Sequence, residues 1–207
     1  SVGFQSPTQL YTPMNREQFF QKNRDVWWRQ AYLAPDYTQP NPNFNDLSAI
    51  LTIHQVEGYE DGTDTDWLSA AVQTGILNNH NLSMQTKAAN TSYFISLGYT
   101  DSKGYVQGDN FKRYSARMNA DNKILDWFRF GLQSFVSLSN YEGRNASLAS
   151  VLNMSPLAKA YNEDGSLYLY PNGFLTPLYY KETEELNQYL TLYGNFYTDI
   201  DIPFLKG

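Results

Sequence analysis

The chain has 207 residues, a length that fits one domain or two small ones. Its 21 acidic and 15 basic residues give a net charge of −6, which repels phosphate backbones and excludes nucleic acid as an expected partner. The sequence contains no cysteine, which excludes a disulfide framework and a thiolate metal site, and no window of about twenty apolar residues that would predict a transmembrane helix.

Aromatic side chains make up 16% of the sequence, and most of them are tyrosines. A tyrosine has an apolar ring and a polar tip, so tyrosines gather at membrane–water boundaries, but they also stack on sugar rings. The composition therefore leaves a membrane protein and a carbohydrate-binding module as alternatives. The mean hydropathy of −0.53 does not separate them, because a barrel with a polar lumen and large loops gives the same value.

The first clear secondary-structure signal is that of a helix. Asn15 and Gln18 have the spacing of a capping box, in which each side chain bonds the backbone of the other. The apolar residues that follow recur near helical spacing and predict a helix over residues 16–32. Pro35 ends this helix, because proline disfavours the helical conformation of the residue before it.

The segments around this helix carry weaker signals. Residues 1–5 (SVGFQ) are typical of the middle of a strand, and we expect both ends of the sequence to continue in a larger protein. Residues 35–45 are rich in proline and asparagine and should be irregular. Residues 47–56 fit either a helical turn or a short strand.

An acidic segment covers residues 57–66. Several carboxylates close together raise the alternative of a calcium site, although their spacing fits no standard calcium loop. The other interpretation is a solvated loop in which Asp64 and Asp66 cap the next helix. That helix is predicted over residues 67–74, with Gly75 just past its end.

From residue 79 onward, long stretches alternate apolar and polar side chains. Successive side chains of a strand leave on opposite faces, so this pattern predicts an antiparallel sheet with one apolar and one polar face. In the clearest stretch, Tyr93, Ile95 and Leu97 share the apolar face, and Phe94 is the exception. The predicted strands cover residues 80–87, 91–100, 111–123, 127–140 and 189–202.

The lengths of these strands and of their connections separate two interpretations. Alternation alone also fits a sheet packed on a soluble core, but soluble strands average about five or six residues, and a membrane-crossing strand needs about ten. The connections at 88–90 and 125–126 are short, whereas those at 101–110 and 141–186 are long, which is the asymmetry of outer-membrane barrels. The sequence therefore predicts a mainly β fold: antiparallel amphipathic strands of a partial transmembrane β-barrel, with a few helices in long loops.

Short motifs along the chain resemble those of SusC-like TonB-dependent outer-membrane transporters. The match runs clearly from about residue 64 to residue 165, and its specificity comes from many motifs that recur in order. They are TDWL at 65–68, TG at 74–75, NHNLS at 79–83, SYFISLGY at 92–99, KGYVQG at 103–108, FKRYSARMN at 111–119, DWFRFG at 126–131, SPLA at 155–158 and YNEDG at 161–165.

The resemblance implies an importer of glycans or peptides in the outer membrane of a Gram-negative bacterium. It implies a barrel of about 22 strands in contact with outer-membrane lipid, an N-terminal plug that contacts the TonB complex, and a SusD-like lipoprotein lid. No segment of this sequence matches the plug. The chain would then comprise a first strand and a helical external loop (1–78), barrel strands (79–140), a long external loop (141–188), and a further strand and turn (189–207).

Two groups of side chains are candidate ligand-binding residues. Arg113, Arg117 and Arg129 lie on the predicted polar face, where they either pair with a ligand or with plug acids or are ordinary solvated residues of the wall. Aromatic side chains in the predicted external segments either stack on sugar, contact the lid or pack the loops together. These are Trp27, Trp28, Tyr32, Tyr161, Tyr168 and Tyr170.

No residue is assigned to catalysis, to a metal or to a cofactor. His54 and His80 lie outside any metal-spaced cluster, and the sequence has no P-loop, GxSxG, HExxH or dinucleotide-binding turn. We therefore expect a protein that is not an enzyme and needs no cofactor. Two other functions stay open: a soluble cell-surface carbohydrate-binding β-domain, and a glycosidase with two carboxylates in one cleft.

Overall fold

The computed structural model describes residues 1–44, 47–183 and 185–202. The chain forms two compact units, each built from segments that are distant in sequence. The first, called the sheet unit, comprises residues 1–6, 74–144 and the described residues after 184, and the second, called the helical unit, comprises residues 7–73 and 145–183. The turn predicted from Pro203 onward lies outside the described residues.

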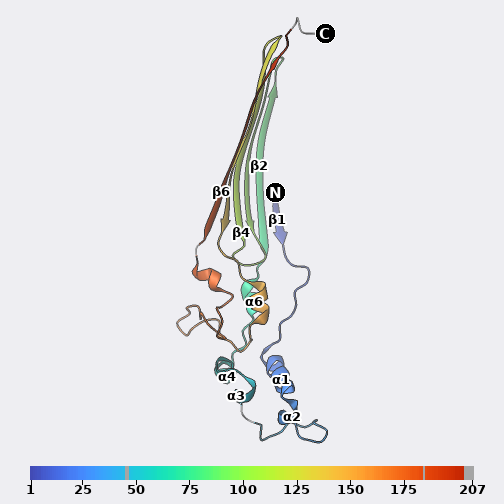
Figure 1. Ribbon diagram of the computed structural model, residues 1–207, viewed down its shortest axis with the longest axis vertical. Coiled ribbons are helices and arrows are strands. Elements are labelled where there is room, and N and C mark those ends of the chain that lie inside the picture. The colour runs from blue at the N-terminus through green and yellow to red at the C-terminus, as the bar shows by residue number, and fades with distance from the viewer. Residues whose placement is uncertain (45–46, 184, 203–207) are drawn as a thin grey trace. The chain divides into compact units, whose positions relative to one another are not determined.

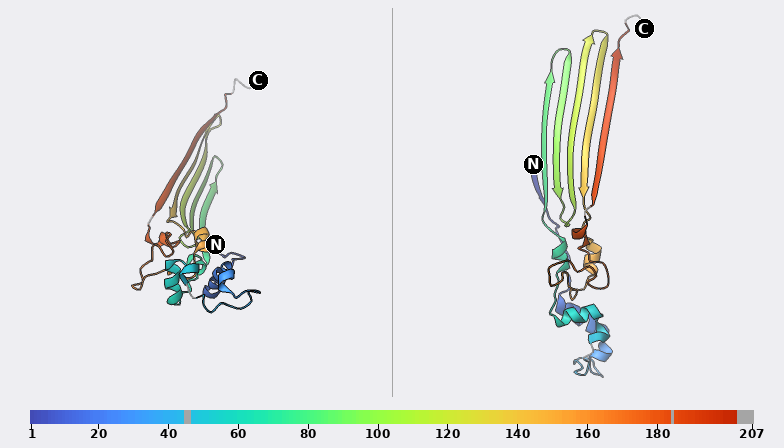
Figure 2. Two further views of the ribbon diagram at one scale, coloured as in Figure 1. Left: turned by 60° about the horizontal axis from the view of Figure 1, so that its bottom comes forward. Right: turned by 90° about the vertical axis from the view of Figure 1, so that its left-hand side faces the viewer.

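The sheet unit is a six-stranded antiparallel sheet in which the strands follow one another in sequence order (Figure 1; Figure 2, right). The strands are β1 (Val2–Gln5), β2 (Gly75–Lys87), β3 (Thr91–Lys103), β4 (Asn110–Leu125), β5 (Phe128–Glu142) and β6 (Leu186–Ile200). The predicted strands are all present, and the mainly β fold with antiparallel strands is confirmed. The sheet is open, with β1 and β6 at its two edges.

The strands β2 to β6 have 13 to 16 residues, and each extends beyond its predicted limits at one end or at both. Two limits fall short of the prediction: β5 begins one residue later than predicted, and β6 ends at Ile200, two residues earlier. The largest difference is in β2, which begins at Gly75 and not at His80. The additional residues pair with β1 on one side and largely with β3 on the other. Both neighbouring strands form backbone hydrogen bonds with this segment, although Ile76 and Leu77 break the alternation of apolar and polar residues. The start of β2 is therefore determined by strand pairing and not by the alternation.

The connections alternate in length along the chain. Residues 88–90 and 126–127 are tight turns at one end of the sheet, and residues 104–109 join β3 to β4 at the opposite end. The two segments of the helical unit are inserted into the chain between β1 and β2 and between β5 and β6. The predicted order of short and long connections is therefore confirmed.

The helical unit contains six α-helices and one 3₁₀-helix within its described residues. They are α1 (Arg16–Val26), α2 (Trp28–Ala31), α3 (Leu47–Ile50), α4 (Ile53–Glu60), α5 (Trp67–Ala71), α6 (Leu148–Asn153) and η1 (Tyr179–Glu182). The capping box of Asn15 and Gln18 is confirmed. The single helix predicted over residues 16–32 is wrong, because the N–H of Trp27 bonds the carbonyl of Arg24 at 3.1 Å and so ends α1 before α2 begins.

Other helix limits also differ from the predictions. Residues 47–56 contain helices and no strand, and α4 starts at a second capping box formed by Thr52 and Gln55. The helix predicted over residues 67–74 ends at Ala71, because Val72 is extended (φ −114°, ψ 157°). Its expected C-terminal glycine, Gly75, is instead the first residue of β2. α6 lies in the long connection predicted at residues 141–186, in agreement with the expectation of helices in long loops.

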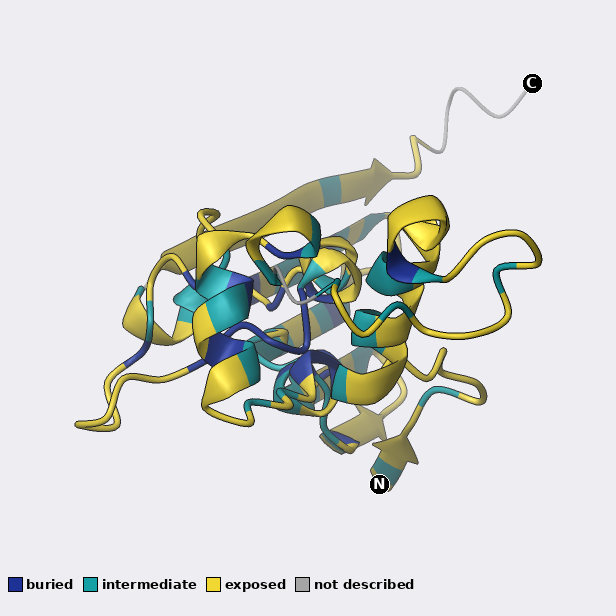
Figure 3. Ribbon diagram, turned by 90° about the horizontal axis from the view of Figure 1, so that it is seen from below, coloured by how far each residue is buried: buried dark blue, intermediate teal, exposed yellow. Residues whose placement is uncertain are grey.

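Most of the buried apolar side chains lie in the helical unit. Leu157 and Leu178 are fully buried, and the indole N–H of Trp67 donates to the carbonyl of Ser155 at 2.9 Å. Figure 3 shows buried stretches in dark blue beneath exposed helix surfaces. In the sheet unit, only Val106 and Ala120 are buried apolar residues among those described. Within the described ranges, no helix has both the length and the apolar character needed to cross a bilayer.

Candidate functional site

One face of the sheet forms a continuous apolar surface, called the apolar face below. The strand register places one row of apolar side chains across β2 to β6: Leu82, Leu97, Ala116, Val136 and Leu192. Large apolar side chains of this face are exposed, and Leu192 reaches 72%. The exposed set is Leu82, Met84, Tyr93, Ile95, Leu97, Tyr114, Met118, Val136, Leu138, Leu190, Leu192, Phe196 and Ile200. The apolar face therefore has no core of its own beneath it.

A polar row ends the apolar face near the connection of β3 to β4. Its members are Asn78, Asp101, Lys112, Asn140 and Gln188. On β2 to β4 the adjacent row is aromatic: the ring centroids of Tyr99 and Tyr114 lie 5.1 Å apart, and the His80 ring stacks on Tyr99 at 6.3 Å. Leu138 and Leu190 continue this row on β5 and β6. On β2 to β4, aromatic rings with polar atoms thus separate the apolar side chains from the polar row.

A second group of aromatic rings lies toward the tight turns. Phe130 and Phe196 are neighbours at 5.6 Å between centroids, and Trp127 contacts Phe128 at 5.8 Å. Ten residue steps along β5 separate Phe128 from Leu138, which corresponds to about 33 Å of strand. The apolar face is therefore bordered by aromatic rings at both ends, on β2 to β4 at one end and on β5 and β6 at the tight-turn end.

The opposite face of the sheet, called the polar face, carries mostly hydroxyl, amide and charged side chains. The register places Arg113, Arg117 and Arg129 on it, as the alternation predicts. The guanidinium carbon of Arg113 lies 6.0 Å from the ring centroid of Phe111, and that of Arg117 lies 5.6 Å from the centroid of Phe135. The sequence analysis did not identify Phe111 and Phe135 as partners of these arginines, because the contacts depend on strand register.

Arg129 has different neighbours from the other two arginines. It lies opposite Asp199 in the register, and Asp121 lies on the next strand, opposite Gly131. The hydroxyl of Tyr197 donates a hydrogen bond to Asp121. The three candidate arginines therefore do not form one group. Arg129 has two acidic neighbours, whereas Arg113 and Arg117 have no acidic residue opposite them in the register.

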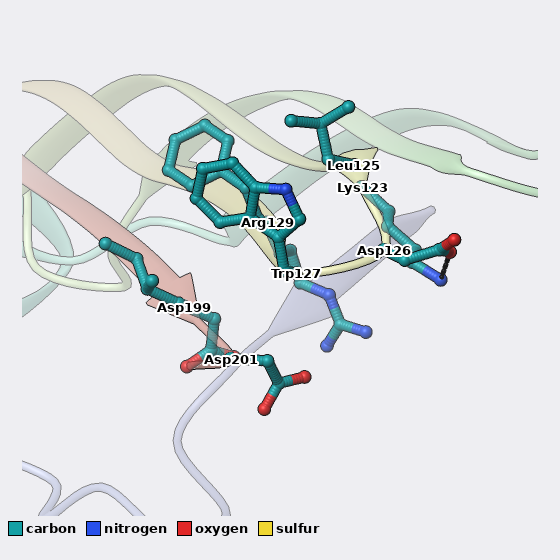
Figure 4. A pocket seen from close by; sticks show the side chains of 9 residues that line it. Lys123, Leu125, Asp126, Trp127, Arg129, Asp199 and Asp201 are labelled. Atoms are coloured by element: carbon teal, nitrogen blue, oxygen red, sulfur yellow. Dashed lines mark hydrogen bonds and ion pairs between the residues drawn. The ribbon is translucent and has the colours of Figure 1, made fainter. Parts of the chain in front are cut away.

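A cavity of about 160 Å³ lies at the tight-turn end of β5 (Figure 4). Arg129, Asp199 and Asp201 line it together with residues of the preceding turn. The ammonium group of Lys123 forms an ion pair of 2.7 Å with Asp126, drawn as a dashed line in Figure 4. This cavity is small and strongly polar, and its charges are mixed, so it does not select a ligand of one sign.

The first aromatic candidates lie around α2. The ring of Trp28 meets Tyr37 edge-on at 4.5 Å and lies near Arg29, and the hydroxyl of Tyr32 donates to Asp25 at 2.9 Å. Trp28 and Tyr32 thus have partners in the helical unit itself. Trp27 is partly exposed and marks the break between α1 and α2.

The second aromatic candidates lie in the segment before η1. The hydroxyl of Tyr161 accepts a hydrogen bond of 2.8 Å from the ammonium group of Lys181, and the backbone of Tyr168 bonds Ala160. Tyr170 is 57% exposed beside Pro171, which is fully buried. Within the described part of the chain, no ring of these tyrosines stacks on Trp27, Trp28 or Tyr32.

Carboxylates of the acidic segment, residues 57–66, form ion pairs with a lysine and accept hydrogen bonds from backbone N–H groups. The ammonium group of Lys159 bonds Glu57 at 3.1 Å and also bonds Asp61, and these two carboxylates raise the pKa of Lys159 to about 12. Asp66 caps α5 as predicted, but Asp64 instead accepts the backbone N–H of Arg16 at the start of α1. No group of three or more potential metal ligands occurs among residues 1–44, 47–183 and 185–202. No sequence pattern indicates Lys159 as a partner of these carboxylates, because it is distant from them in the chain.

No family model matches the chain. Among characterised proteins, it is similar to the TonB-dependent receptor SusC of Bacteroides thetaiotaomicron, with 32% identity over 49% of this chain and 10% of that protein. TonB-dependent receptors P26 and P3 of Formosa agariphila are 26% and 28% identical over 54% and 58% of the chain. The chain spans between 10% and 14% of the length of these relatives.

Two solved structures share the fold. A chain of the RagAB peptide importer in the closed–closed state superposes with a TM-score of 0.68 at 19% identity, over 100% of this chain and 26% of that one. A chain of the RagAB peptide transporter gives the same TM-score at 20% identity, over 98% of this chain. The resemblance to SusC-like TonB-dependent receptors is therefore confirmed over about half of the sequence, and the fold over nearly all of it.

Proposed function

We propose that this chain forms part of the wall and external loops of a TonB-dependent outer-membrane importer of the SusC-like class. The observation that carries the proposal is the exposed apolar face between two aromatic borders. A strand tilt of about 35–45° reduces its length of about 33 Å to a height of about 25 Å, which is the height of the apolar band of outer-membrane barrels.

Contact with lipid explains the chemistry of the apolar face. Soluble monomers rarely expose contiguous apolar patches larger than a few hundred Å², because water solvates such surfaces poorly. Against hydrocarbon the same side chains are favourably placed, and the rings of Tyr99 and Tyr114 would lie at the headgroup level. The polar row from Asn78 to Gln188 would then lie in water outside the hydrocarbon.

With the apolar face toward lipid, the roles of the remaining parts of the chain follow. The polar face would line the lumen of the barrel, and the open edges β1 and β6 would pair with further strands, because unpaired backbone groups are costly in hydrocarbon. The helical unit would form external loops in which Trp27, Tyr161 and Tyr170 contact the ligand or the lid.

The partners and the ligand follow from the relatives. We infer that the importer works with a SusD-like lipoprotein lid, that the TonB complex energises it through a plug, and that it carries a glycan or a peptide. SusC supports these inferences by sequence similarity over about half of the chain, and the RagAB peptide importer supports them by its shared fold. On this proposal the protein is a transporter in the outer membrane of a Gram-negative bacterium and not an enzyme.

A soluble carbohydrate-binding domain is the competing function. In such a domain the apolar face would be buried against a second layer within the sheet unit. Leu82, Leu97 and Leu192 are instead exposed at the centre of this face. We therefore favour the membrane protein.

Site-directed labelling of the protein in the membranes of its own cells tests the proposal. The chain has no cysteine, so a single cysteine placed in it is its one thiol, and the unsubstituted protein labelled in the same way gives the background signal. Leu97→Cys and Leu192→Cys on the apolar face, labelled with a nitroxide, should be relaxed by lipid-soluble oxygen more strongly than by a water-soluble nickel complex. Ser96→Cys and Thr191→Cys are matched controls on the polar face of the same strands.

The contrast between neighbouring positions decides the outcome. The control positions should show the opposite preference, because adjacent residues of a strand point to opposite faces. Equal access of both reagents to Leu97→Cys and Ser96→Cys, or protection of Leu192→Cys from both reagents, would contradict contact with lipid.

A further inference from the structure

The polar face has a charge opposite to that of the whole chain. Its strand positions carry five basic residues: Lys87, Arg113, Arg117, Lys123 and Arg129. They carry two acidic residues: Asp121 and Asp199. The complete sequence has a net charge of −6, so a positive excess on this face runs against the composition of the chain. Positive potential on one surface of an acidic protein favours an anionic partner at that surface.

The acidic residues of the polar face lie toward its tight-turn end. Asp121 accepts the hydrogen bond of Tyr197, and Asp199 lies opposite Arg129. Four residue steps, or about 13 Å of strand, separate Arg117 from Asp121. Among the described side chains, neither Arg113 nor Arg117 has a carboxylate oxygen within 4.0 Å. These two guanidinium groups therefore keep their charge uncompensated.

Each of these two arginines has an aromatic ring beside it on the polar face. Arg113 lies near Phe111, and Arg117 lies over the ring of Phe135, so each guanidinium is next to an aromatic group while its N–H groups stay available. Ser115 lies between them on β4, with Gly98 and Ser137 beside it on the neighbouring strands. The arginines thus flank three small residues, among which Ser137 is buried, while both arginines are themselves exposed.

We propose that Arg113 and Arg117 bind the carboxylate groups of the transported ligand as it passes along the polar face. The inference rests on the proposed import function and adds a chemical class to its ligand. A guanidinium group presents parallel N–H donors that match a carboxylate. The two arginines are four residue steps apart, about 13 Å, so they select an oligomer that carries several carboxylates. A uronate-containing oligosaccharide and an acidic peptide share this chemistry.

Binding measurements on the full-length protein, purified in detergent in the form its own cells produce, test the proposal. The probes are hexagalacturonate and hexaglutamate, each paired with a neutral counterpart, galactohexaose and hexaglutamine. The double variant Arg113→Gln, Arg117→Gln should bind the carboxylated probe about three- to tenfold more weakly, as expected for exposed charge-assisted hydrogen bonds, and the neutral counterpart unchanged. Wild-type affinity for the carboxylated probe should also fall with added salt.

Arg144→Gln is the matched control. Arg144 already pairs with Glu185 at 3.1 Å, outside the strands, so its loss should leave the preference for carboxylates unchanged. Comparison of the two carboxylated probes distinguishes a glycan from a peptide as the source of the acid groups.

The possible outcomes separate this inference from the proposed function. Tight binding of a neutral probe with no preference for its carboxylated form would overturn the carboxylate site and leave the importer intact. Unchanged binding but a lower melting temperature in the double variant would mean that an acidic segment of the protein itself pairs with the arginines, and would also overturn it. Failure of both carboxylated probes to bind would overturn the carboxylate site, whereas the labelling contrast between Leu97→Cys and Ser96→Cys tests the import function separately.

Discussion

At the scale of single residues, the position of the Tyr197 ring on β6 requires a glycine at position 131 on β5. The two residues face each other in the register, and the Tyr197 ring covers the position that a Gly131 side chain would occupy. A Cβ atom at this position would lie 2.2 Å from the ring carbon that bears the hydroxyl. The absence of a side chain at Gly131 therefore allows the Tyr197 hydroxyl to reach Asp121.

The variant Gly131→Ala should destabilise the protein by roughly 1–2 kcal/mol. The ring of Tyr197 would have to rotate away, and its hydrogen bond to Asp121 would be lost. Urea or thermal unfolding in detergent measures this change. Gly194→Ala is the matched control, because a Cβ on Gly194 meets no atom within 4 Å. Equal effects of the two substitutions would show that backbone entropy, and not the position of Tyr197, decides the stability.

At the scale of elements, α5 shows how local chemistry starts a short helix. The carboxylate of Asp66 accepts the backbone N–H of Ser69 at 2.9 Å, and the Ser69 hydroxyl also donates to it. The hydrogen bond from the Ser69 side chain is the main reason why the pKa of Asp66 is lowered, with the backbone bond next. The cap holds the helix that carries Trp67, whose indole bonds Ser155 in the core.

The cap of α5 should respond to acid. Because the pKa of Asp66 is lower in the folded protein, its stabilising effect is present above the ordinary aspartate pKa of 3.8 and is lost as the pH falls through the folded value. Asp66→Ala should cost about 1 kcal/mol at pH 7 and remove this acid sensitivity. Hydrogen exchange of the α5 amides, followed by mass spectrometry at pH 7 and in acid, measures both effects.

Asp66→Asn is the matched substitution for this cap. Asparagine caps helices about as well as aspartate but does not titrate, so α5 should stay protected at pH 7 and lose its dependence on acid. An acid response of α5 that persists in Asp66→Asn would assign it to another carboxylate of the helical unit.

At the scale of the whole molecule, the two units are stabilised differently. The helical unit has a conventional core around Leu157, Leu178 and Trp67. The sheet unit has long strands paired along most of their length but exposes the large apolar side chains of its apolar face. Because no layer of described residues within the unit covers that face, the unit depends on its surroundings to cover it.

The isolated 207-residue chain should therefore bind a fluorescent apolar dye and self-associate in water. Detergent micelles should cover the apolar face, dissociate the oligomers and lower the dye signal per chain. Size-exclusion chromatography with dye titration measures both effects. A monodisperse monomer in water that binds no dye would contradict an apolar face adapted to lipid.

The sequence by itself determined the two faces of the sheet. Side chains alternate with a period of two along any strand, so the apolar face and the polar face, including Arg113 and Arg117, follow from residue order alone. The capping boxes and turns are equally local, which is why the start of α1 was predicted correctly.

Only the tertiary structure decided which distant groups meet. The start of β2 at Gly75, the pairing of Lys159 with Glu57 and Asp61, and the place of Arg117 over Phe135 each depend on a partner from another segment. Such contacts arise from strand register and packing, which many sequence patterns permit equally. The order of residues determines which side chains lie on each face of a strand, whereas the tertiary structure determines which distant residues they contact.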